Sequence, residues 1–128
     1  MGDQLNTHMR FTSPSSYHNM EGSGNIHAVC EPKSISDRSQ KLVVTVTNGS
    51  EKTVEWSKPE TFQLEKKIED QWYFHETDKK YIESDDKVLE QKASAVFEYR
   101  IGWLAKPGTY RLVYLFQGDW CSAEFVIP

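Results

Sequence analysis

Alternation of hydrophobic and polar residues is the main pattern in this chain, and it begins near residue 25. In the stretch KLVVTVTNGS, every second residue from Leu42 to Val46 is aliphatic, and the residues between them are valine or threonine. A period of two in β-branched residues, closed by an Asn-Gly turn, predicts a β-strand. No stretch has the 3.6-residue period of an amphipathic helix. The sequence therefore predicts an all-β protein.

The same alternation predicts strands in several further stretches. In NIHAVCEP, Pro32 lacks a backbone N–H and is expected to end or kink an edge strand. TFQLEKK and QWYFH, joined by a polar turn, predict a hairpin with Phe62 and Leu64 facing inward. The charged stretch that follows them contains at most a short edge strand at residues 81–82 and a further apolar pair at residues 88–89. With AVFEYRI, TYRLVYLF and WCSAEFVIP, the total is about seven strands, which is typical of a β-sandwich.

A tyrosine stands near the beginning of the most hydrophobic of these strands, directly after a Pro-Gly turn. Pro107 presets a backbone angle and Gly108 tolerates a sharp turn. In Greek-key sandwiches of the immunoglobulin type, a tyrosine at this place donates a hydrogen bond to upstream backbone and fixes the crossover between the sheets. We expect Tyr110 to form this corner with Pro107 and Gly108. The alternative is a tyrosine that only packs in the core.

Three segments resemble the short bacterial immunoglobulin-like domains of exported or lipid-anchored Gram-positive proteins. They are LVVTVTNGS, FQLEKKIEDQWY and LAKPGTYRLV, and the resemblance covers residues 26–127. It implies an immunoglobulin-like Greek-key β-sandwich of about seven strands. It also implies a non-enzymatic, extracytoplasmic module, secreted or anchored at the cell surface.

The chain divides into two regions on composition. Residues 1–24 are rich in Ser, Asn and Gly and show no periodicity, so we expect a flexible N-terminal tail or linker. Residues 25–128 form the sandwich domain, which we expect to be monomeric. An alternative for the N-terminal region is an arm that adds a strand to the open sheet edge of a neighbour.

The two cysteines fall on the inward side of their strands. In immunoglobulin-like sandwiches the first strand often breaks, and its second half pairs in parallel with the last strand. Pro32 marks such a break here, so Cys30 and Cys121 are expected to be neighbours, and we predict a disulfide between them. The alternative is two buried thiols that act as small apolar side chains.

Composition and charge exclude several function classes. The formal net charge is −4 and the charges are mixed along the chain, so we expect no nucleic-acid partner. No apolar run approaches the roughly 18 residues that span a bilayer, so membrane contact is expected only through an anchor that this sequence does not contain. The histidines are scattered, CxxC is missing, and there is no Gly-x-Ser-x-Gly elbow. We therefore expect no metal, no cofactor and no enzyme activity.

Aromatic residues are the remaining candidates for a contact site. Trp72 and Trp103 are expected in the core, whereas Trp56, Tyr73 and Trp120 are expected to point outward and to contact a protein or a cell-surface glycan. The favoured function is a binding or spacer module. One alternative is a proteinase inhibitor that uses the charged loop at residues 76–88, and another is an assembly subunit joined through its N-terminal arm.

Overall fold

The structure is a computed structural model that describes residues 13–15, 24–37, 40–57, 62–80, 88–100 and 106–128, with the backbone alone for residues 13 and 75–80. No helix occurs in these ranges, as predicted. The strands that the structure describes are β1 (Ser13–Pro14), β2 (Ile26–Glu31), β3 (Lys41–Asn48), β4 (Val54–Glu55), β5 (Phe62–Ile68), β6 (Gln71–Lys80), β7 (Val88–Leu89), β8 (Ser94–Arg100), β9 (Gly108–Phe116) and β10 (Asp119–Ile127).

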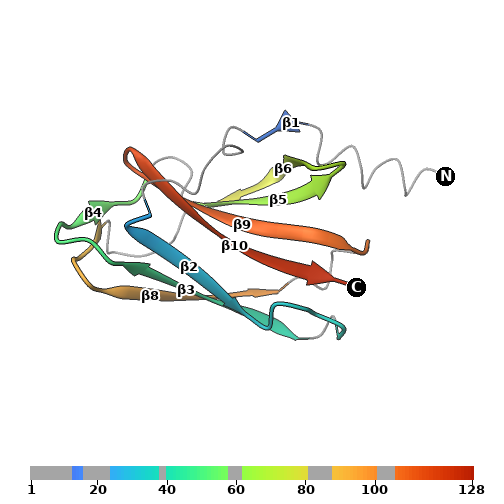
Figure 1. Cartoon of the computed structure of the whole chain (residues 1–128), viewed down its shortest axis with the longest axis horizontal. Coiled ribbons are helices and arrows are strands. Elements are labelled where there is room, and N and C mark those ends of the chain that lie inside the picture. Colours follow the sequence, from blue (N-terminus) through green and yellow to red (C-terminus); the bar gives the residue numbers. More distant parts are fainter. Residues whose placement is uncertain (1–12, 16–23, 38–39, 58–61, 81–87, 101–105) are drawn as a thin grey trace.

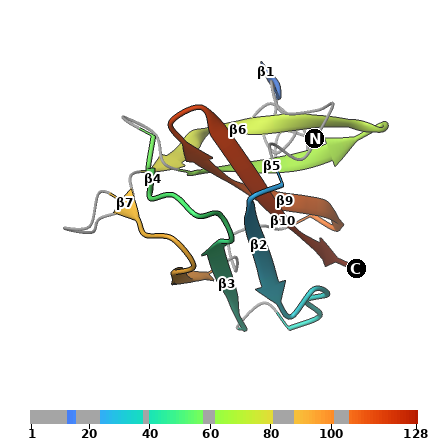
Figure 2. The same ribbon diagram turned by 60° about the vertical axis from the view of Figure 1, so that its left-hand side comes forward.

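The strands form two stacked sheets, as expected for a sandwich (Figure 1). The larger sheet has the order β1-β6-β5-β9-β10, and the smaller one has the order β2-β3-β8. Strands β4 and β7 pair with one another at one end of the molecule (Figure 2). The short edge strand considered at residues 81–82 lies outside the described residues. The apolar pair at residues 88–89 forms β7.

The core between the sheets is built from the side chains that the alternation placed inward. Leu42, Val44 and Val46 of β3 are fully buried. On the opposing sheet, alternate residues of β9 and β10 face them, and all are buried: Tyr110, Leu112, Tyr114, Phe116, Cys121, Ala123, Phe125 and Ile127. Because burial of apolar surface drives folding, this alternation is what fixes the faces of both sheets.

The predicted break in the first strand is confirmed. Strand β2 ends at Glu31, directly before Pro32, and Ser34 then forms a parallel bridge with Val126 of β10. The backbone N–H of Ile35 donates to the Val126 carbonyl at 2.8 Å, and the Val126 N–H donates to the Lys33 carbonyl at 2.8 Å. The chain thus passes from the smaller sheet to the edge of the larger one.

A buried asparagine holds the turn that follows β3. The Nδ2 group of Asn48 donates to the carbonyls of Lys52 at 2.7 Å, Leu89 at 3.0 Å and Glu90 at 3.2 Å. Its Oδ1 accepts from the backbone N–H of Ser50 at 3.0 Å. One amide therefore ties the turn after β3 to the end of β7, which explains why the strand closes on an asparagine.

Strand β1 lies against the edge of β6, where Ser13 pairs with Phe74 and Pro14 with Tyr73 (Figure 1). The N-terminal arm considered in the sequence analysis thus adds a strand to this chain's own sheet at these residues. Residues 1–12 and 16–23 lie outside the described residues, so the flexible tail stays a prediction there.

The charged loop proposed at residues 76–88 begins later than expected. Strand β6 continues to Lys80, with Lys79 paired to Gln63 and Lys80 to Phe62 of β5. The first five residues of the expected loop are therefore part of a sheet, and residues 81–87 lie outside the described residues.

Candidate functional site

Tyr110 occupies the corner that its position predicts. Its hydroxyl donates to the Lys106 carbonyl at 2.7 Å, and its ring stacks on Phe125 with the centroids 5.6 Å apart. A Cβ at Gly108 would lie 3.0 Å from Cε of Lys66, so a side chain there would displace the end of the lysine. This hydrogen bond to upstream backbone is the one that a tyrosine corner requires.

Trp56 is not an exposed aromatic, and the expectation that it points outward is wrong. Its side chain is only 5% exposed. The residue forms an isolated bridge to Phe116 of β9, which turns the indole into the core. There it stacks on Phe116 at 4.2 Å and meets Phe97 edge-on at 5.8 Å.

Tyr73 and Trp72 exchange the faces that the sequence analysis gave them. Tyr73 is paired with Lys66, and Lys66 is paired with the buried Tyr110, so the three residues share the inner face of the sheet. The Tyr73 side chain packs against the core. Trp72 lies on the outer face of the larger sheet, with the Arg111 guanidinium 4.4 Å from its ring centroid. The prediction of an outward Tyr73 is therefore wrong, and so is a core position for Trp72. Trp103 lies outside the described residues.

Trp120 points away from the main core, as its parity predicts, but it is not available as a contact surface. It is 9% exposed and packs with Val113 and Leu115 in a second, smaller apolar cluster on the outer face. The Arg111 guanidinium lies 5.5 Å from its ring centroid. Of the three aromatic residues proposed as a contact surface, Trp56 and Trp120 are therefore buried, and Tyr73 is partly buried.

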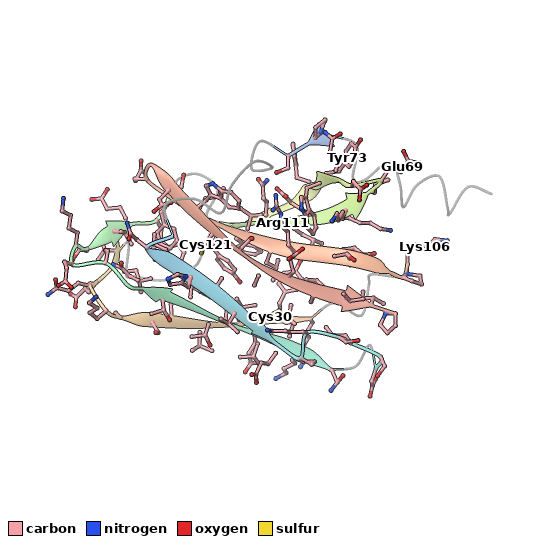
Figure 3. The ribbon with its side chains drawn as sticks, in the orientation of Figure 1. Cys30, Glu69, Tyr73, Lys106, Arg111 and Cys121 are labelled. Carbon is pink, nitrogen blue, oxygen red and sulfur yellow. The ribbon has the colours of Figure 1, made fainter. Side chains whose placement is uncertain are left out.

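Cys30 and Cys121 are both buried, as expected, but they are free thiols and the predicted disulfide is absent (Figure 3). The Cys30 thiol donates to the Glu124 carbonyl at 2.9 Å. Cys121 precedes Glu124 by three residues on the same strand, which places it about 10 Å further along. Burial raises the pKa of Cys30, and raises the pKa of Cys121 to about 12, so neither thiol is an activated nucleophile.

A buried polar cluster on the outer face of the larger sheet was not predicted. Both the Nη2 and Nε groups of Arg111 donate to Oε1 of the fully buried Glu65, at 2.6 Å and 2.7 Å. The other oxygen of Glu65 accepts from Ser15 at 2.7 Å and Gln63 at 2.6 Å. Ser15, which follows β1, is thereby attached to the sheet. The signal for the cluster was present, since Glu65 and Arg111 carry opposite charges on the outward parity of two predicted strands.

The smaller sheet carries the most exposed aliphatic surface among the described residues. Val29 of β2 is 52% exposed and Val96 of β8 is 63% exposed, and both pair with Thr45 of the central strand. A shallow groove of about 830 Å³ lies on this side and is lined by Val29, Glu31, Pro32, Lys33, Val43 and Thr45. We call the outer side of this sheet, with Val29, Val43 and Val96, the valine face.

Metal and membrane features were searched over the same described ranges. No group of three or more His, Cys, Asp or Glu side chains that could hold a metal ion occurs there. Nor does any helix in that part of the chain have the length and apolar character needed to cross a membrane.

Comparison with known proteins gives one family match. A family model described as a bacterial Ig-like domain matches residues 25–126. No curated protein matches the chain. Among solved structures, the chain is similar to the Pseudomonas fluorescens alkylpurine DNA glycosylase AlkC bound to DNA containing an abasic site analog, with 14% sequence identity and a TM-score of 0.48. That match covers 81% of this chain and 30% of the glycosylase chain.

Proposed function

Because the chain belongs to the bacterial immunoglobulin-like domain family, we propose that it is a non-catalytic binding or spacer module of a surface or secreted bacterial protein. The observation that carries a binding role is the valine face. Single exposed valines are common on protein surfaces, but Val29 and Val96 flank Thr45 on one rung of the smaller sheet, with Val43 close by. Contiguous apolar surface of this kind favours contact with a partner.

A non-catalytic role agrees with the use of the reactive side chains. The carboxylate of Glu65 is occupied by Arg111, Ser15 and Gln63. The Cys121 thiol is buried with a pKa raised to about 12. General acid–base or nucleophilic catalysis needs such groups to be accessible and poised near the working pH, which these two are not.

The partner that we propose is a protein or a cell-surface glycan, bound on the valine face. The test is a pull-down from a surface extract of the source bacterium with the unmodified chain, with Val29→Glu and Val96→Glu, and with Val126→Glu as a matched control. Val126 is also an exposed valine, but it lies on the larger sheet. A partner lost with both face variants and kept with the control supports the proposal, and equal capture by all four chains contradicts it.

An extracytoplasmic location is part of the proposal and needs its own test. It is supported by the family, whose members typically occur in extracellular proteins. The two thiols lend it no support, since no disulfide joins them. Antibodies raised against the domain should label intact cells that express the natural protein. Labelling that appears only after permeabilisation would contradict the surface role.

A second candidate function is an assembly subunit joined through the N-terminal arm, and the pairing of β1 with β6 favours it. Ser13 and Phe74 are backbone partners, and directly opposed strand residues are close enough for an engineered disulfide. Full-length Ser13→Cys mixed with full-length Phe74→Cys can form a mixed disulfide only if the arm of one copy occupies the edge of another. A covalent heterodimer on a non-reducing gel supports assembly, and its absence, with ring closure inside a Ser13→Cys/Phe74→Cys chain, refutes it.

A further inference from the structure

A lysine ammonium near the tyrosine corner is buried without a counter-charge. Lys66 of β5 is 7% exposed, and its Nζ lies 5.3 Å from the centroid of the Tyr110 ring. Among the described residues, none forms a hydrogen bond or an ion pair with this Nζ. Buried charges in proteins are normally paired, and a contact with one ring face does not replace the hydration of an ammonium.

A second lysine belongs to the same corner. Lys106 begins the corner, and its backbone carbonyl accepts the Tyr110 hydroxyl at 2.7 Å. Figure 3 places its side chain at the end of the sandwich where β9 begins. Burial, followed by the positive charge of Lys106, lowers the pKa of Lys66. The two ammonium groups therefore repel each other, and in the described part of the chain neither of them forms an ion pair with an acid group.

The Lys66 side chain occupies the space that a side chain at Gly108 would take. Gly108 has no Cβ, and a Cβ built there would lie 3.0 Å from Cε and 3.7 Å from Nζ of Lys66. The missing side chain is thus what lets the Lys66 ammonium reach the corner. A small positive site at the rim of the sandwich is thus formed by the Tyr110 ring, Gly108 and the two lysines.

We propose that Lys66 and Lys106 form a binding site for an oxyanion group, either a phosphate or a carboxylate of a ligand. An oxyanion between the two ammonium groups would accept charge-assisted hydrogen bonds from both. It would supply the counter-charge that Lys66 lacks. The site is separate from the valine face, so it does not depend on the binding role proposed there.

The test is a titration of the full ¹⁵N-labelled chain with sodium phosphate and, separately, with sodium acetate, each at constant ionic strength set with sodium chloride. The amide signals of Gly108 and Tyr110 report on the site. We expect a saturable shift of these signals in the unmodified chain. The anion that saturates at the lower concentration identifies the preferred ligand class. Lys66→Met keeps the aliphatic stem and removes the charge, and it should abolish the saturable shift.

Two further variants keep the test decisive. Lys106→Met removes the second cation without changing a core residue, so it should weaken binding at least tenfold even if Lys66→Met does not fold. Lys41→Met removes a charge of the same kind from the other sheet, where Lys41 pairs with Glu98 at 3.0 Å, and it should leave the titration unchanged. Shifts that do not saturate, or that are equal in all three lysine variants and the unmodified chain, would overturn the proposal.

Discussion

Replacing Arg111 by methionine tests what holds the outer face of the larger sheet together. Glu65 is fully buried, and Arg111 is its cationic partner, with nitrogen–oxygen distances of 2.6 Å and 2.7 Å. Methionine approximates the aliphatic stem but has no charge. Arg111→Met therefore leaves a buried carboxylate with two neutral donors, Ser15 and Gln63. A buried carboxylate without its cation is strongly unfavourable.

The expected loss is large compared with the stability of a small domain. Removing one partner of a buried ion pair costs about 3–5 kcal/mol. The guanidinium also stacks on Trp72 at 4.4 Å, a contact worth about 1 kcal/mol in such settings. We therefore expect the free energy of unfolding to fall by about 4 kcal/mol, and since domains of this size are stable by roughly 5–15 kcal/mol, the melting temperature should drop by more than about 10 °C.

The assay is urea denaturation followed by far-UV circular dichroism, with two comparison variants. Glu65→Gln/Arg111→Met removes both charges but leaves an acceptor for Ser15 and Gln63, so it should recover a substantial part of the loss. Arg100→Met removes an exposed arginine of β8 and should change stability by less than about 0.5 kcal/mol. If Arg111→Met unfolds within about 1 kcal/mol of the unmodified chain, or if the double variant is no better, the ion pair does not stabilise this face.

Three further perturbations test the corner, the buried turn and a thiol. Tyr110→Phe removes the hydrogen bond to the Lys106 carbonyl and should lower the free energy of unfolding by about 1–3 kcal/mol; an unchanged denaturation midpoint would show that the tyrosine only packs. Asn48→Asp places a carboxylate where an amide donates to three carbonyls, so stability should fall by about 3 kcal/mol or more at pH 7. That deficit should shrink toward pH 4 as the new carboxyl gains a proton, and a deficit independent of pH would contradict this reasoning. Burial raises the pKa of Cys121 from 9.0 to about 12. The folded thiol then keeps a proton that the unfolded one loses, so stability should decrease as the pH rises above about 9, and Cys121→Ala should reduce this slope; equal slopes in both chains would exclude Cys121 as the cause.

The faces of most strands could be predicted because one side of each strand is distinctly apolar. In β3, Leu42, Val44 and Val46 make one face wholly aliphatic, whereas the other face combines Val43 with lysine and threonine, and the three residues of the aliphatic face are buried. A shift of one residue would expose all of them, so the sequence specifies the register strongly. The same alternation correctly predicted the inward face of β10, where Cys121, Ala123, Phe125 and Ile127 are buried.

The hairpin β5–β6 shows why alternation can fail. The stretch QWYFH has aromatic residues at three successive positions, so period two does not distinguish its faces. The turn decides instead. Glu69 and Asp70 both have positive φ, 50° and 67°, and this two-residue connection pairs Ile68 with Gln71 and hence Lys66 with Tyr73. Two non-glycine residues in left-handed conformations are hard to foresee from the sequence.

The outer face of the larger sheet was missed for a related reason. Strand β9 is apolar at nearly every position, which is typical of a strand buried on both sides. We assigned one face to the core and left Trp120 on the other face exposed. The sequence does not reveal that Ser15, 50 residues before Glu65, closes over Glu65 on that face. Likewise, Cys30 and Cys121 were correctly placed inward, but their offset along β10 depends on where the first strand crosses between the sheets.

One pairing register connects the fold of the corner with its positive charge. The corner fixes Lys106, because its carbonyl must accept the Tyr110 hydroxyl. The ladder between β5 and β9 sets Lys66 directly opposite Tyr110. A shift of that ladder by one residue would turn Lys66 to the outer face, separate it from Lys106 and bring Glu65 into the core. Since the buried Glu65–Arg111 pair opposes such a shift, the ion pair on one face of the sheet also holds the two lysines together on the other.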